Sequence, residues 1–258
     1  MKSSGRARRI APVYYNEWDA YPAEWLRRLM AAGLIPEGDV DERSIKEVQQ
    51  EDLKGYRQCH FFAGIAGWSL ALQYAGWDEA EQVWTGSCPC QPFSIAGKRK
   101  GVEDERHLWP EFHRLIRACQ PTHVFGEQVA SKDGRGWLAG VQTDLEGDGY
   151  ATGSADMGAA SVRAPHARQR LWWVAYTYKS RLERVHSTRR KINLQSTFET
   201  VRGFGEAKDR VLQRLNGISN RLDGPRTYRS QIKALGNSIV PAVAAEFIKA
   251  YMEVIGLG

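Results

Sequence analysis

Residues 58–76 read QCHFFAGIAGWSLALQYAG, and no other stretch says as much about the fold. The apolar run at residues 58–65 breaks into glycine, which predicts a buried strand followed by a tight turn. The segment WSLALQYAG (68–76) then supplies a helix. Strands that alternate with helices in this way build mostly parallel α/β sheets.

The same alternation continues on both sides of this unit. Residues 20–33 carry apolar side chains at helical spacing, at Trp25, Leu26, Leu29 and Met30. Residues 38–48 predict a turn and then a weak strand or a short helix. The other predicted strands are 10–18, 83–87, 122–127 and 170–176, and the other predicted helices are 110–119, 137–149 and 241–255. We therefore expect an α/β fold with a mostly parallel sheet, in which Trp172 and Trp173 lie in the core.

Length and composition narrow the class of protein. A chain of 258 residues can bury one sizeable core and carry a small appended region. It contains no apolar run of 18 residues and no secretory signal, so we expect a cytoplasmic protein that does not enter a membrane. Its four cysteines lack zinc-finger spacing, so we expect no metal.

The positive charge of the chain is concentrated in one segment. Residues 176–230 hold 13 Lys and Arg against 5 Asp and Glu, whereas the whole chain holds 36 against 30. A local surplus of this kind is expected for a surface that meets a phosphate backbone. Composition alone equally allows a solvated insert.

A cysteine follows the predicted strand 83–87 in the string PCQPFS (89–94). In an open α/β sheet, ligands bind at the carboxyl ends of the strands, so a thiol there meets the substrate. Cationic residues that fold back over Cys90 would favour its thiolate. These residues are Lys98, Arg99, Lys100 and Arg106. The alternative is an ordinary buried cysteine, which two flanking prolines, a glutamine and a serine make a poor fit.

The string PCQPFS resembles the catalytic motif of DNA cytosine-carbon-5 methyltransferases of bacterial and phage type. Four more motifs of that family are matched by FAGIAG (62–67), FGEQV (125–129), PHARQR (165–170) and GNSIVP (236–241). Ala66, Gln128 and His166 depart from the family pattern. The resemblance covers most of the chain, and it implies a Rossmann-like sheet that binds S-adenosylmethionine.

The order of the motifs departs from the family. The resemblance leads us to expect a ribose-binding strand after the glycine motif, but VYYNEWD (13–19) and PEGDV (36–40), which match that strand and the next motif, lie upstream. We infer a circular permutation in which residues 10–57 supply the permuted cofactor-binding strands. The alternative is an unrelated N-terminal extension.

The resemblance also implies roles for the matching residues in catalysis. Cys90 would add to carbon 6 of cytosine, which activates carbon 5 toward the methyl group. Glu127, whose pKa would have to be raised, would hold ring nitrogen 3 or donate a proton to it. Arg170 would bind the ring carbonyl oxygen, and Arg168 would order the pocket or a phosphate.

Further residues are implied for binding. Glu17 would accept hydrogen bonds from the ribose, Trp18 would stack on adenine, and Asp39 would accept from the adenine amino group. The other expected cofactor residues are Phe62, Ala63, Gly64, Ile65, Gly67, Val40, Pro89, Asn237 and Ser238. The expected contacts to a flipped base and its DNA are Gln91, Ser94, Lys98, Arg99, Lys100 and Arg106.

These expectations give a domain plan. Residues 1–9 form a basic tail, 10–175 with 231–258 form the catalytic domain, and 176–230 form a small target-recognition region. We expect a monomer that acts on double-stranded DNA, as in restriction-modification systems, with short or weak sequence specificity or a partner chain that supplies it.

Two rival hypotheses stay open. A methyltransferase that has lost catalysis could still hold DNA or the cofactor, and the same chemistry could act on transfer RNA.

Overall fold

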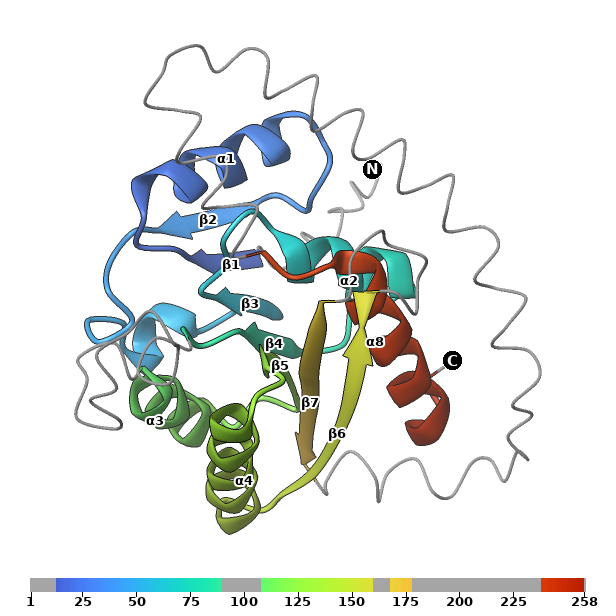
Figure 1. Ribbon diagram of the computed structural model, residues 1–258. Coiled ribbons are helices and arrows are strands. Elements are labelled where there is room, and N and C mark those ends of the chain that lie inside the picture. The colour runs from blue at the N-terminus through green and yellow to red at the C-terminus, as the bar shows by residue number, and fades with distance from the viewer. Residues whose placement is uncertain (1–12, 90–107, 160–167, 178–237, 258) are drawn as a thin grey trace, which may run out of the picture.

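The computed structural model describes residues 13–89, 108–159, 168–177 and 238–257 (Figure 1). They form one seven-stranded sheet in the order β2-β1-β3-β4-β5-β7-β6. The strands are β1 (Val13–Asn16), β2 (Gly38–Asp41), β3 (Gln58–Phe61), β4 (Val83–Gly86), β5 (His123–Val129), β6 (Tyr150–Gly158) and β7 (Gln169–Thr177). The helices are α1 (Ala20–Ala31), η1 (Gln50–Leu53), α2 (Gly67–Ala75), α3 (Trp109–Cys119), α4 (Lys132–Gly147) and α8 (Pro241–Ile255).

The expected α/β fold with a mostly parallel sheet is confirmed. Strands β2, β1, β3, β4 and β5 are mutually parallel neighbours, and β7 runs antiparallel to both β5 and β6. Strand β1 pairs with β3 and strand β2 pairs with β1, so both N-terminal strands belong to the same sheet.

Two helical layers cover the sheet (Figure 1). Helices α1, α2 and α8 pack on one face, and η1, α3 and α4 pack on the other. Helix α3 packs on the sheet through one apolar side, because its buried residues Phe112, Leu115 and Ile116 recur at helical spacing. Trp172 and Trp173 are both buried as expected, and they serve opposite faces because neighbouring strand residues alternate.

Strand β6 is not predicted by the sequence pattern. Most of its residues (YATGSADMG) are small or polar, and they do not alternate in burial as the residues of a half-buried strand do. The strand forms because it pairs with β7 along its whole length. Pairing with β7, and not the local sequence pattern, therefore determines that these residues form an edge strand.

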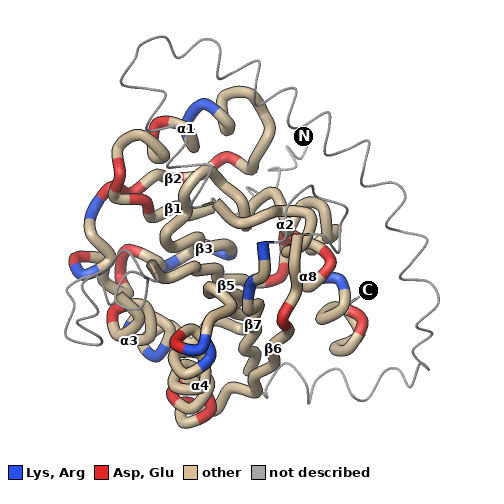
Figure 2. Tube along the Cα trace, viewed as in Figure 1, with Lys and Arg blue, Asp and Glu red and all other residues tan. Residues whose placement is uncertain are grey.

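The described surface carries both signs of charge. Acidic and basic residues are interspersed on α1, α4 and α8 (Figure 2). The basic segment 98–106 lies outside the described residues, and so does 176–230 apart from residues 176 and 177 at the end of β7. Among the described helices, none is long and apolar enough to span a membrane.

Candidate active site

Several of the predicted site residues that the structure describes lie at the carboxyl edge of the sheet. Strands β1, β3, β4 and β5 run parallel, so the residues that follow or end them meet at one edge. Glu17 follows β1, Gly64 lies after β3, Ser87 follows β4, and Glu127 lies near the end of β5. Two carboxylates, Glu17 and Glu127, mark two regions of this edge.

Glu17 is a buried carboxylate held by backbone amides. The amide of Gly64 donates to its Oε2 at 2.8 Å, and the amide of Asp19 donates to its Oε1 at 3.0 Å. The side chain is therefore fixed between the end of β1 and the turn after β3. A carboxylate has about four acceptor sites, so an amide-bound carboxylate can also accept from hydroxyl groups.

The turn between β3 and α2 owes its shape to left-handed residues. Phe62, Gly64 and Ala66 have φ values of 52°, 55° and 68°. Glycine adopts this conformation freely, whereas a side chain makes it costly. The alternation folds the backbone tightly enough for the amide of Gly64 to reach Glu17.

Gly67 brings the C-terminal motif to the same turn. A Cβ atom added at Gly67 would lie 2.6 Å from Ile239 Cγ1 and 3.3 Å from Ser238 Oγ. Only glycine permits this close approach at the start of α2. Ser238 thus lies beside the glycine motif, while Asn237 lies outside the described residues.

The other expected cofactor residues differ in their surroundings. Trp18 is 78% exposed, which leaves its ring face available at the edge beside Glu17. Val40 is partly buried and packs against the part of the core that includes Leu26 and Leu29 of α1. Asp39 accepts a hydrogen bond from the Tyr56 hydroxyl at 2.6 Å. Ala63 is buried, and Ile65 and Phe62 are partly buried in core clusters.

Glu127 forms the centre of the second region. Glu127 pairs with Trp172 and Val129 pairs with Arg170 across β5 and β7, so these four side chains share one face. That register places Arg170 Nε 2.5 Å from Glu127 Oε1. Arg168, two residues before Arg170, has a buried Nε that lacks a hydrogen-bond partner within the described ranges.

Burial and charge oppose each other at Glu127. Burial raises the pKa of Glu127, and the positive charges of Arg170 and Arg168 together with the neighbouring Ser87 hydroxyl only partly offset that effect. Burial likewise lowers the pKa of Arg168, with the like charge of Arg170 adding to that effect. A carboxyl group with a raised pKa keeps its proton to a higher pH than usual, as a general acid requires.

Two residues of this region were not anticipated from the sequence. The indole Nε1 of Trp68 donates to Ser87 Oγ at 3.0 Å, and Ser87 hydrogen bonds to Glu127. Their association depends on the register of β4 against β5, where Gly86 lies opposite Gly126. Local sequence carries no signal for that register beyond the position of Ser87 at a strand end.

The two neighbouring cysteines must be considered separately. Cys88 is buried in the part of the core that includes Phe112 of α3, and burial raises the pKa of its thiol well above the usual range. Such a thiol is inert at neutral pH. Pro89 is exposed at the end of the described segment. Cys90 lies outside the described residues, as do Gln91, Ser94, Lys98, Arg99, Lys100 and Arg106.

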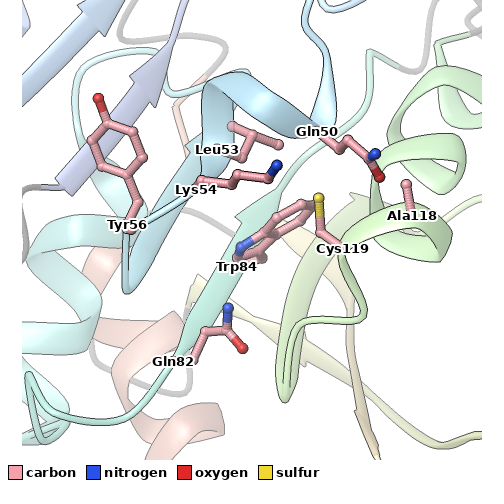
Figure 3. Close-up of a pocket in the computed structure, with 9 residues that line it drawn as sticks. Gln50, Leu53, Lys54, Tyr56, Gln82, Trp84, Ala118 and Cys119 are labelled. Carbon is pink, nitrogen blue, oxygen red and sulfur yellow. The ribbon is translucent and has the colours of Figure 1, made fainter.

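A pocket of about 300 Å³ lies elsewhere on the molecule (Figure 3). Residues before β3 and β4 and the end of α3 line it, among them Lys54, Gln82, Trp84 and Cys119. It therefore opens at the amino edge of the sheet, opposite Glu17 and Glu127. No predicted site residue lines it, and within the described ranges no cluster of His, Cys, Asp and Glu could hold a metal.

Comparison with known proteins assigns the chain to a family. Residues 78–221 match the model of the C-5 cytosine-specific DNA methylases, which is more than half of the chain. The chain belongs to this family. The match includes Ser87, Glu127, Arg168 and Arg170.

Individual methylases of known type are similar to the chain. The type II methyltransferase M.HhaI of Haemophilus parahaemolyticus is 29% identical over 168 residues, which cover 64% of this chain and 42% of that protein. M.AplI of Arthrospira platensis is 34% identical over 96 residues, or 36% of this chain and 28% of that protein. The methylase chain thus spans less than half the length of both relatives.

A solved methyltransferase structure is also similar. The Dnmt2 methyltransferase of S. pombe has a TM-score of 0.41 and 12% identity, covering 73% of this chain and 55% of that one. The family assignment does not depend on this likeness.

Proposed function

We propose that this protein is a DNA cytosine-5 methyltransferase that uses S-adenosylmethionine and a covalent Cys90 adduct. The observation that carries the proposal is the Glu127 cluster beside the segment leading to Cys90. Ser87 hydrogen bonds to Glu127, and Cys90 follows Ser87 by three residues. Three residues span at most about 11 Å, so the nucleophile is tethered to the region that would hold the base.

The Glu17 region fits S-adenosylmethionine. Backbone amides orient the Glu17 carboxylate, and ribose hydroxyls are the donors that such a carboxylate takes in nucleotide-binding sheets. The exposed ring of Trp18 suits adenine, and the glycine turn keeps Cβ atoms away from the close approach at Gly67. When bound, S-adenosylmethionine supplies an electrophilic methyl group.

Cys90 begins the reaction by adding to the target base. Its thiolate forms a bond to carbon 6, and the electron pair of the 5,6 double bond moves toward carbon 5 and ring nitrogen 3. Carbon 5 would then take the methyl group as its bond to the sulfonium sulfur breaks, which leaves S-adenosylhomocysteine. Loss of the carbon 5 proton to a base restores the double bond as the sulfur–carbon bond breaks, which returns the thiolate.

Glu127 and the arginines stabilise the displaced electrons. A Glu127 carboxyl with a raised pKa can donate a proton to ring nitrogen 3 as density moves there. The buried Arg168 Nε, which has no partner among the described residues, is a donor suited to the base or a phosphate. Arg170 would bind the ring carbonyl oxygen while it keeps Glu127 in place.

The strand order supports the proposed permutation. Strand β3, which carries the glycine turn, lies inside the sheet, and β1 and β2 extend it on one side although they come first in the chain. Residues 10–57 would therefore complete the cofactor half of the catalytic domain. Residues 176–230 would serve target recognition on double-stranded DNA.

A covalent trapping experiment tests the proposal. The protein is incubated with S-adenosylmethionine and DNA that contains 5-fluorocytosine, whose fluorine blocks the last step and leaves the adduct intact. We expect a protein–DNA band on a denaturing gel for the wild type, and none for Cys90→Ser. The control is Cys88→Ser, which should still form the adduct because the Cys88 thiol is buried. A folded wild type that binds DNA but yields no adduct would favour a binding protein.

A further inference from the structure

Ser87 stands between a core tryptophan and the Glu127 carboxyl. Strands β4 and β5 pair in parallel with Gly86 opposite Gly126, so the next residues, Ser87 and Glu127, lie side by side. The Ser87 hydroxyl hydrogen bonds to the Glu127 carboxyl. The same hydroxyl oxygen lies 3.0 Å from the indole nitrogen of Trp68.

The direction of these hydrogen bonds is fixed by chemistry. An indole N–H can only donate, so Ser87 Oγ accepts from Trp68. The hydroxyl proton is then available for Glu127, because a carboxylate can only accept. In this hydrogen-bond relay, Trp68 donates to Ser87 and Ser87 donates to Glu127.

The packing of Trp68 holds the first donor of this relay in place. It is 4% exposed, and its ring stacks on Phe125 at a centroid distance of 6.1 Å. Its ring also meets Trp172 edge to face at 5.6 Å. A buried ring with two aromatic contacts has little freedom to rotate, so its N–H holds the Ser87 oxygen in one place.

Ser87 and Arg170 hold Glu127 from different strands. Arg170 comes from β7 and adds a positive charge, whereas Ser87 comes from the end of β4 and adds none. A hydroxyl can keep donating to one carboxyl oxygen while the other oxygen carries a proton. The Ser87 contact therefore suits both protonation states that an acid catalyst must visit.

We propose that Ser87 is a positioning residue, oriented by Trp68, that fixes one oxygen of the Glu127 carboxyl so that the other faces the target cytosine. This role rests on the proposed function, because it assigns Glu127 to the base. Ser87 itself does not touch the substrate in this scheme. Its contribution comes through the orientation and protonation of Glu127.

The first test replaces Ser87 by alanine. Loss of a hydrogen bond to a charged group should lower kcat roughly tenfold or more, with the KM for S-adenosylmethionine unchanged. The Ser87 bond lowers the pKa of Glu127, so its removal should raise that pKa and move the alkaline limb of the pH–rate profile to higher pH. Ser87→Thr, which keeps the hydroxyl, should restore both.

Two further variants separate positioning from general packing. Trp68→Phe keeps an aromatic ring but removes the N–H, and it should move the alkaline limb in the same direction by a smaller amount. Ser69→Ala is the matched control, because it removes the hydroxyl of a different serine, in α2, that contacts Tyr15 instead. It should leave the pH–rate profile unchanged.

A measurement without turnover distinguishes failure of this inference from failure of the proposed function. The Glu127 carboxyl can be followed by carbon NMR across a pH titration of folded wild type and Ser87→Ala. We expect the Glu127 midpoint to lie higher in Ser87→Ala. An unchanged midpoint overturns the role of Ser87, whatever the activity. A higher midpoint in Ser87→Ala, together with a wild type that transfers no methyl group, would instead retain the contact and refute the proposed function.

Discussion

Glu17 and Glu127 are both buried carboxylates at the carboxyl edge of one sheet, yet different kinds of group hold them. Glu17 is bound by two backbone amides, whereas Glu127 is bound by an arginine and a serine hydroxyl. Backbone amides belong to the fold and fix a geometry. Side-chain donors can be rearranged, and they change how readily a carboxyl group takes up a proton.

This difference matches two separate tasks. A residue that orients a ligand needs a fixed acceptor, which the turn after β3 provides for Glu17. A residue that exchanges protons needs a raised pKa and adjustable partners, which burial, Arg170 and Ser87 provide for Glu127. The comparison predicts that equivalent substitutions at the two glutamates have different consequences.

The largest expected effect is on catalysis by Glu127→Gln. The amide cannot supply a proton to the base, so kcat should fall by roughly 100-fold or more. The dissociation constant for S-adenosylmethionine should stay within about twofold of wild type. Single-turnover methylation and calorimetric titration measure the two quantities. Equal loss of both would show that the two regions are not separate.

Glu17→Gln should have a smaller effect on a different quantity. Each Glu17 oxygen accepts from a backbone amide, so one of those amides must face the new NH₂ group. We expect a loss of about 1–3 kcal/mol in unfolding free energy and a roughly tenfold weaker binding of S-adenosylmethionine. Urea unfolding and calorimetry test this. Unchanged cofactor binding would also count against a cofactor role for residues 10–57.

The smallest expected effect belongs to Ala66→Gly in the turn beside Glu17. Ala66 has φ 68°, and relief of its left-handed conformation should stabilise the fold by about 1 kcal/mol. Its methyl group is buried, and losing it costs about 0.8 kcal/mol. Unfolding free energy should therefore change by less than about 1 kcal/mol, and a change beyond that would show that the turn contributes differently.

Much of the fold follows from local pattern. The strand and helix of residues 58–76 and the buried stripe of α1 at Trp25, Leu26 and Leu29 are where the sequence predicts them. Strand β6 was missed because its strand state comes from pairing with β7. Pairing between distant segments leaves no periodic mark in the residues themselves.

The candidate site divides in the same way. Glu17, Gly67, Glu127 and Arg170 stand out from the sequence because their motifs are specific, and the structure brings them to one edge. Ser87 does not stand out, because its contact with Glu127 exists only through the register of β4 on β5. Residues that support a catalytic group are set by tertiary structure, so they are the ones that sequence reasoning misses.

The fate of the hydrogen on cytosine carbon 5 tests the proposed chemistry most directly. The protein would be given DNA with tritium at that position and S-adenosylmethionine with a ¹⁴C-labelled methyl group. The account predicts one tritium released to water for each methyl group transferred. Methyl transfer with the tritium retained in the DNA would place the methyl group on another atom and contradict the account.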